Sequence, residues 1–146
     1  MIRRNVTTGI SMAIASLMLT VGGAIYLLFR PQTLVMFHLA DTVGLATAIK
    51  DCRAATGFRL PEWMIYSLPN ALWSAAYILI VDGLLRDDSL KQRLQTVALM
   101  PLLGIVSETL QAMGLVPGTF DWLDIGAYAL PYLLYIIMLS IGIINK

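Results

Sequence analysis

Charged residues are scarce in this sequence, and the scarcity argues against most classes of soluble protein. Only 13% of its 146 residues are charged, whereas 58% are hydrophobic, and the mean hydropathy is +0.77. A soluble domain is typically about a quarter charged and about half apolar. The formal net charge of +1 provides no strong field for nucleic acid, so we expect no direct nucleic-acid binding.

Cysteine and histidine are almost absent. Cys52 and His38 are the only residues of their kinds, so an intrachain disulfide is impossible and a zinc site lacks the several ligands that it needs. The sequence shows no phosphate-binding glycine loop and no recognisable set of nucleophile, base and orienting residue. We predict no metal and no cofactor, and we favour a non-enzymatic protein without excluding an enzyme.

Long apolar runs are what the sequence does contain. A membrane-spanning helix needs about 20 predominantly apolar residues. Four segments meet this requirement, and Glu108 is the only charge in the third. We predict an all-α polytopic membrane protein, a four-transmembrane-helix bundle formed as a single transmembrane domain over residues 1–146. Its helices are expected at about 6–29, 62–85, 94–116 and 125–145.

The connection between the first two predicted spans is too apolar for an ordinary loop. After Pro31, residues about 32–56 contain Gly44 as the only strong helix breaker. We expect one helix or two short ones here, forming an interfacial or re-entrant segment. Lys50 and Arg53, near its end, are candidates for contacts with lipid phosphates.

The distribution of Lys and Arg predicts the orientation, because short cytoplasmic loops are enriched in these residues. The loop RDDSLKQR and the two termini together carry six of them, whereas the loop GTFDWLD carries none and has two aspartates. We therefore place both termini in the cytoplasm and GTFDWLD outside. Residues 30–61 weaken the asymmetry, because they place four positive residues on the outer side.

Small residues form a seam along the first span. They are spaced by 4, 3, 4 and 3 positions, which places them on one helix face: Gly9, Ala13, Ser16, Thr20 and Gly23. Close approach of small residues drives helix association in lipid. The seam packs either against another helix of the same chain or, in a homo-oligomer, against a second copy.

Polar residues in three predicted spans fall at a similar depth. Asn70 and Glu108 lie roughly 12–14 Å below the predicted outer ends at about 1.5 Å per residue, and Tyr132 lies at a similar level. A carboxylate that faces lipid at this depth is costly, so Glu108 should face the bundle interior or a wet cavity. We predict a polar pocket with Asn70, Glu108 and Tyr132 as its floor, Tyr66, Trp73, Gln111 and Tyr128 as its walls, and Asp121 and Asp124 at its rim.

Each of these signals also has a purely structural interpretation. Glu108 could hold the helices in register by bonding Asn70, a tyrosine, or a backbone carbonyl freed by the kink expected at Pro69. Asp124 directly precedes the last apolar run and could be its N-cap, and Asp121 could cap that helix or bind a cation. The structural and ligand-binding interpretations both stay open at this stage.

The pattern Glu108-x-x-Gln111, followed by PGTFDWLD at residues 117–124, resembles the hallmark region of the VanZ-like family of small bacterial membrane proteins. The resemblance covers about residues 100–140. This sequence departs from the family pattern where Gly118 and Thr119 stand in place of a common arginine and where Tyr128 replaces an expected asparagine. VanZ-like proteins are linked to glycopeptide resistance, without an established molecular activity. The resemblance implies a bacterial inner (plasma) membrane protein with a polar site at Glu108, Gln111, Asp121 and Asp124.

Three functions fit these observations. The first is a non-enzymatic protein whose pocket near the outer leaflet binds a lipid headgroup or small ligand. The second is an oligomeric membrane anchor or sensor subunit of a bacterial envelope or defence complex. The third is an intramembrane enzyme that acts on a lipid-linked substrate with Glu108 as acid or base. The expected partners are membrane lipids, a second copy of the chain, and a cytoplasmic protein.

The charged loop between the second and third spans is where a cytoplasmic partner would dock. Its candidate residues are Arg86, Asp87, Asp88, Lys91 and Arg93. A run of this kind can equally be a solvated loop that only sets the topology.

Overall fold

The computed structural model describes residues 2–32 and 34–142, and all regular secondary structure in these residues is helical. This confirms the all-α prediction. The helices are α1 (Ile2–Phe29), α2 (Val35–Thr42), α3 (Ala46–Ala55), α4 (Glu62–Tyr66), α5 (Leu68–Leu84), α6 (Leu90–Ala112) and α7 (Trp122–Ser140). The end of the predicted fourth span, residues 143–145, lies outside the described residues, as does Lys146.

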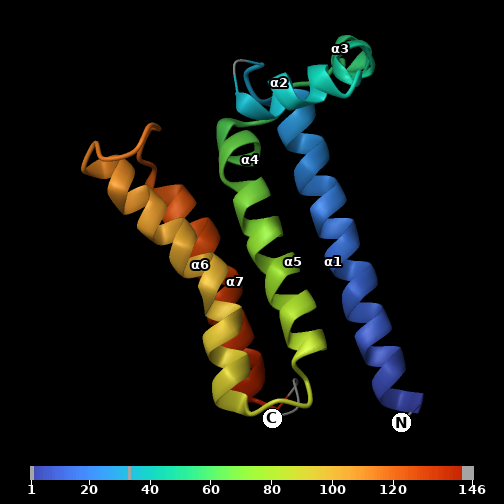
Figure 1. Cartoon of the computed structure of the whole chain (residues 1–146), viewed down its shortest axis with the longest axis vertical. Coiled ribbons are helices and arrows are strands. Elements are labelled where there is room, and N and C mark those ends of the chain that lie inside the picture. The colour runs from blue at the N-terminus through green and yellow to red at the C-terminus, as the bar shows by residue number, and fades with distance from the viewer. Residues whose placement is uncertain (1, 33, 143–146) are drawn as a thin grey trace.

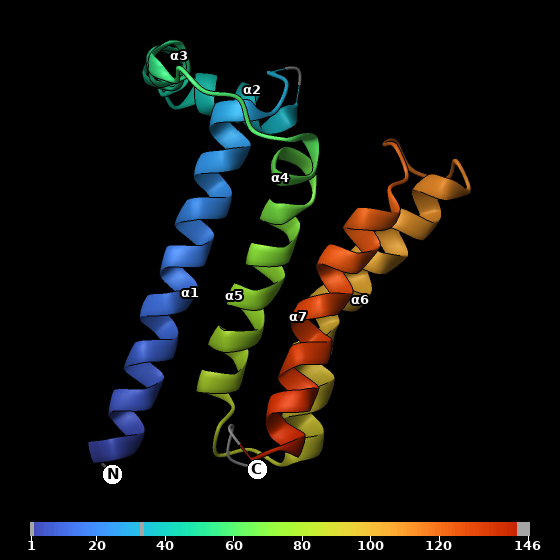
Figure 2. The same cartoon turned by 180° about the vertical axis from the view of Figure 1, so that it is seen from behind.

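The long helices α1, α5, α6 and α7 run side by side, and the short helices α2 and α3 cross one end of the bundle (Figures 1 and 2). α1 packs on α5, α5 packs on α6 and α7, and α6 and α7 form a pair. The described chain begins and ends at the same end of the bundle, opposite α2 and α3 (Figure 1). Four antiparallel passes produce this arrangement, because each pass reverses the direction of the chain.

Three helices are long and apolar enough to cross a membrane. They are Thr8–Phe29, Glu62–Leu84, which combines α4 and α5, and Trp122–Ser140. The third predicted span is not among them, because Glu108 and several uncharged polar residues make α6 less apolar on average than the other long helices. α6 also ends at Ala112, four residues before the predicted boundary at 116. The described residues therefore contain three candidate spans, and the less apolar helix α6 packs beside α5 and α7.

Pro69 interrupts the second span, as predicted. α4 ends at Tyr66, and α5 begins at Leu68 with Pro69 in its first turn. Proline has no N–H, so the carbonyl of Ile65 loses its helical partner. Arg30 replaces that partner, because its Nε donates to Ile65 O at 3.2 Å and its Nη2 donates to Tyr66 O at 2.7 Å. The freed carbonyl is thus held by Arg30 and not by Glu108.

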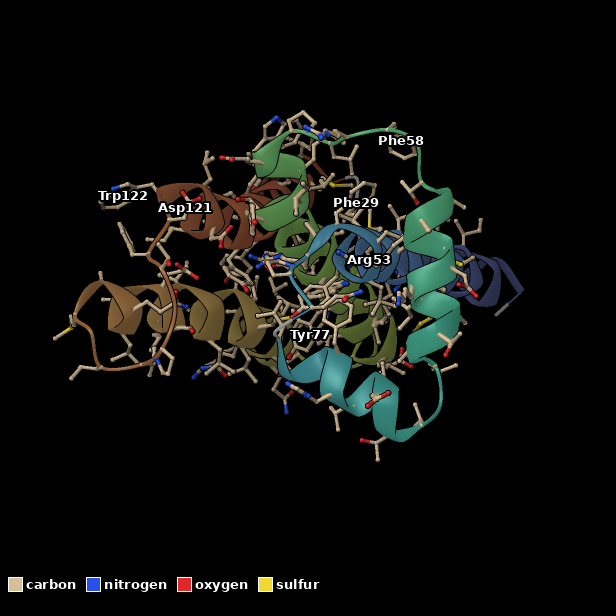
Figure 3. All side chains as sticks on the ribbon, turned by 90° about the horizontal axis from the view of Figure 1, so that it is seen from above. Phe29, Arg53, Phe58, Tyr77, Asp121 and Trp122 are labelled. Atoms are coloured by element: carbon tan, nitrogen blue, oxygen red, sulfur yellow. The ribbon has the colours of Figure 1, made fainter. Side chains whose placement is uncertain are left out.

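The two short helices α2 and α3 fall within the segment predicted as interfacial or re-entrant, and they lie across the end of α1 (Figures 1 and 2). The structure gives Arg53 two contacts within the chain, and its predicted contact with lipid phosphate stays a prediction. Its guanidinium reaches from α3 to the end of α1 (Figure 3), donates from Nη1 to Leu27 O at 2.7 Å, and stacks over the Phe37 ring at 5.6 Å. A cation near a helix C-terminus satisfies carbonyls that have no helical partner.

The small-residue seam of α1 does not pack within the chain. Gly9, Ala13, Ser16 and Thr20 are exposed, and a methyl group added at Gly9 or Gly23 would meet nothing within 4 Å. The face of α1 that contacts α5 lies elsewhere and includes the fully buried Ala15. The intrachain interpretation of the seam is therefore wrong.

The helices α5, α6 and α7 are splayed at one end and close together at the other. At the end that carries α2 and α3, the α6–α7 pair leans away from α4 and α5. At the opposite end α5, α6 and α7 converge, whereas α1 diverges from α5 (Figures 1 and 2). The buried core of Ile78, Val97, Tyr135 and Leu139 joins α5, α6 and α7. The connection between α5 and α6 spans only residues 85–89, so these two helices are held close at the converging end.

Candidate functional site

A polar pocket of about 670 Å³ opens where the helices splay. Its walls come from α1, from the α4–α5 junction, from the end of α6, and from the α6–α7 loop with the start of α7. The structure brings together seven of the nine residues predicted for such a pocket: Tyr66, Asn70, Glu108, Gln111, Asp121, Asp124 and Tyr128. The polar stripes of separate helices therefore converge on one cavity.

Glu108 fixes the α6–α7 loop. Its side chain is 5% exposed. Oε1 accepts a hydrogen bond from Gln111 Nε2, and Oε2 accepts one from the backbone N–H of Asp121, both at 3.3 Å. Asn70 is also buried but donates to Tyr66 O at 3.3 Å. The predicted bond between Glu108 and Asn70 is thus replaced by contacts to residues on the loop side.

The two aspartates of the loop have different environments. Asp121, and not Asp124, is the N-cap of α7, because its Oδ1 accepts from Leu123 N at 2.8 Å. Asp124 lies in the first turn of α7, where a negative charge favours the helix dipole. Its Oδ1 is buried without a hydrogen-bond partner in the described part of the chain. Asp124 also lines the pocket.

A glycine allows α6 and α7 to approach closely beside the pocket. A Cβ at Gly104 would overlap the ring of Tyr128, so only glycine lets this ring lie flat on α6. On the other side of α7, Ser74 Oγ donates to Tyr128 O at 3.3 Å. Tyr128 is thereby fixed between α5 and α6, with its side chain at the pocket wall.

Trp73 and Tyr132 do not line the pocket, which corrects two of the predicted positions. The Trp73 indole lies in the α1–α5 interface, 5.6 Å from the Tyr26 ring, and fills the space that a Cβ at Gly22 would occupy. Tyr132 packs against the buried core closer to the converging end. The bond from Ser74 to Tyr128 sets the register of α5 against α7, and this register places Tyr132 below the pocket.

Two pocket residues from α1 and its C-terminal end were not expected. Arg30 lies between the rings of Tyr26 and Tyr66, with its guanidinium 5.4 Å and 4.7 Å from their centres. Tyr26 and Arg30 both line the cavity. The sequence signal was a lone arginine directly after an uncharged span and before Pro31, a position where a cation can satisfy helix-end carbonyls.

A second polar cluster is buried at the converging end. Asp82 of α5, Arg93 of α6 and Tyr135 of α7 form an ion cluster in which the arginine and tyrosine both donate to Asp82 Oδ1. The Tyr135 bond is 2.6 Å, and residues Asp82, Arg93 and Tyr135 are 5%, 2% and 4% exposed. Arg86 Nη2 also pairs with Asp82 Oδ2 at 3.5 Å. One carboxylate thus joins three helices.

This cluster changes the predicted docking surface. Arg93 faces the bundle interior, so its assignment to an exposed partner-docking site is wrong. Arg86 is only partly exposed and is engaged by Asp82. Asp87, Asp88 and Lys91 remain exposed at the turn between α5 and α6. Burial of Arg93 results from the start of α6 at Leu90, with Ser89 and Gln92 forming a capping box.

Comparison of the chain with protein families, with curated proteins and with solved structures gave no match. Among the residues that the structure describes, no group of three or more His, Cys, Asp and Glu side chains is placed to hold a metal ion. The site is therefore interpreted from its own geometry.

Proposed function

We propose that this chain is a four-span protein of the bacterial inner membrane whose pocket binds a lipid headgroup or a small polar ligand near the outer leaflet. The observation that carries the proposal is the pocket itself, a polar cavity built by α1, α4–α5, α6 and α7 at the ends of apolar helices. The proposed role is binding without catalysis, and the resemblance of residues 100–140 to VanZ-like proteins is part of the proposal.

The outer surface of α6 supports its assignment as the fourth span. Its charged residues Arg93 and Glu108 face the bundle interior. Its exposed face is apolar along the middle of the helix, where Leu99, Leu102, Leu103 and Val106 are 51–68% exposed. Intramembrane ionisable residues normally face the bundle interior while lipid contacts apolar side chains. α6 has this arrangement although it is less apolar on average than the three candidate spans.

Aromatic residues support a membrane boundary at the level of the pocket. Trp63 is 53% exposed and Trp122 is 75% exposed, and both begin helices at the splayed end. Trp122 points away from the bundle beside Asp121 (Figure 3). Tryptophan is enriched at the membrane–water interface. A headgroup would therefore lie at the level of this pocket.

The decisive experiment fills the pocket and measures the lipid that stays bound. Native mass spectrometry of the full chain, extracted gently from its own membrane, should show a retained lipid. Thr119→Trp adds a large side chain at the pocket lining and should reduce retention about tenfold, which corresponds to about 1.4 kcal/mol. Thr109→Trp, on the exposed side of α6, is the matched control. Equal retention by wild type and Thr119→Trp would show that lipid binds elsewhere.

A second function, an oligomeric membrane subunit, is favoured by the seam of α1. Its small residues are exposed instead of packed within the chain. Small residues at a lipid-facing position permit close helix contact between copies. Ala13→Leu should reduce the oligomer population in native mass spectra if the seam joins copies, whereas Ile14→Leu, which is exposed outside the seam, should leave it unchanged.

A further inference from the structure

We propose that the pocket selects a primary ammonium group carried close to a phosphate, the chemistry of a phosphoethanolamine headgroup. This proposal rests on the binding function proposed above and names the class of its ligand. It follows from how charge and unused hydrogen-bonding capacity are distributed around the cavity.

Opposite charges occupy different elements of the pocket. Arg30 follows α1 and is held against the carbonyls of α4. Glu108, Asp121 and Asp124 belong to the end of α6, to the loop and to α7. One potential positive charge therefore stands against three potential negative charges, on separate walls of one cavity. A ligand that carries both signs matches this arrangement better than an anion or a neutral sugar.

The acidic wall has acceptor capacity to spare. Asp124 lines the cavity, and its carboxylate accepts no hydrogen bond from the described residues. Each Glu108 oxygen accepts one, from Gln111 and from the Asp121 backbone. Each carboxylate oxygen has two lone pairs, so further N–H groups can be accommodated. A primary ammonium supplies three N–H donors, whereas a quaternary choline supplies none. The wall therefore favours an unmethylated amine.

Arg30 retains donors for a phosphate. A guanidinium has five N–H groups, and the described contacts use Nε and Nη2 on the carbonyls of Ile65 and Tyr66. These two bonds and the flanking tyrosine rings immobilise the cation before a ligand arrives. Preorganisation of this kind lowers the entropic cost of binding. Arginine is also well suited to phosphate oxygens.

The test is a headgroup competition on the full chain. The delipidated protein is offered equal amounts of phosphatidylethanolamine, phosphatidylcholine and phosphatidylglycerol with identical acyl chains, and native mass spectrometry measures the adducts. We expect the ethanolamine lipid to be retained about tenfold more than either of the others. Asp124→Asn should reduce that preference to about twofold or less, and Asp51→Asn, exposed on α3 and outside the pocket lining, should preserve it.

The outcomes separate this inference from the function on which it rests. Equal retention of all three lipids would overturn the amine selectivity and leave headgroup binding intact, whereas no retained lipid at all would contradict the binding function. Selectivity that disappears with EDTA would show that a divalent cation bridges the carboxylates, and would overturn the direct contact. The comparison of lipids on wild type holds even if Asp124→Asn fails to fold.

The source of the amine is distinguished by a water-soluble competitor. Displacement of the lipid by millimolar phosphoethanolamine would support recognition of the headgroup alone and allow a ligand that enters from water. Retention of phosphatidylethanolamine against that competitor, with the same preference over the other lipids, would support recognition of the intact lipid. In both cases the selective group is the primary ammonium.

Discussion

The two ends of the helical bundle treat buried charge in opposite ways. At the converging end, Asp82 receives its counter-charge from Arg93 and a hydrogen bond from Tyr135, all inside the protein. At the splayed end, Glu108 is satisfied by a side-chain amide and a backbone N–H, and Asp124 keeps an unpartnered buried oxygen beside a cavity. The first arrangement uses the charges to join helices, and the second leaves carboxylates at the wall of the cavity that we propose as a binding site.

Chain connectivity explains the difference. Residues 85–89 hold α5 and α6 together at one end, so a short ion pair can close between them. At the other end, α6 continues into α7 and not into α5, and its tip leans away with the α6–α7 loop (Figure 2). Buried charge is costly unless it is paired, so the converging end has few alternatives to internal pairing. The splayed end can leave a polar cavity.

The largest expected effect on stability is at the converging end. Arg93→Leu leaves Asp82 buried with the Tyr135 hydrogen bond and, as its described counter-charge, only the longer contact to Arg86, and should lower the free energy of unfolding by about 3–5 kcal/mol. The measurement is unfolding of the purified protein from mild detergent by a denaturing detergent. Lys91→Leu, two residues away and exposed, should change the free energy of unfolding little. An unchanged value for Arg93→Leu would mean that the ion cluster does not join the helices.

Gly104→Ala tests the close contact between α6 and α7 beside the pocket. Its methyl group would overlap the Tyr128 ring, so we expect a loss of about 2 kcal/mol, typical of overpacking, together with weaker lipid retention as the ring is displaced at the pocket wall. Gly126→Ala on α7 meets nothing within 4 Å and is the matched control. If both glycine variants unfold alike, the close packing of Tyr128 on α6 is wrong.

Tyr135→Phe removes one hydrogen bond from the ion cluster while keeping its shape. Because the acceptor is charged, we expect a loss of about 1.5 kcal/mol, measured by the same unfolding titration. Tyr132→Phe, which packs against the same core, should change stability less. Lipid retention should be unaffected by either change, since both residues lie outside the pocket lining. Reduced lipid retention in Tyr135→Phe would show that the two ends are coupled.

Glu108→Gln should have the smallest effect on stability. Glutamine preserves the shape and can still accept one of the two bonds, so we expect a loss of about 0.6 kcal/mol. The preference for ethanolamine lipid should fall less than in Asp124→Asn, because each Glu108 oxygen already accepts one hydrogen bond within the chain. Loss of a cellular phenotype with lipid retention intact would favour the intramembrane enzyme instead. Ser107→Ala, the exposed neighbour, is the control.

Sequence patterns predicted most of the polar side chains that line the pocket, but not the hydrogen-bond partner of each. Regular helical spacing brought Glu108 and Gln111 to one cavity with residues of other helices. The bond from Glu108 to the Asp121 backbone could not be predicted, because it depends on the path of the loop at residues 113–121. The capping box at Ser89 and Gln92 was a readable signal that α6 begins at Leu90, and it would have moved Arg93 into the helix.

The sequence by itself determined the helical class, the three apolar candidate spans and the interruption at Pro69, because hydropathy and the missing proline N–H act locally. The tertiary structure alone decided that Arg30 caps the broken helix, that Arg93 turns inward to Asp82, and that the seam of α1 stays exposed. These outcomes depend on helix register and tilt. Many weak packing contacts between distant segments set both, and no local pattern records them.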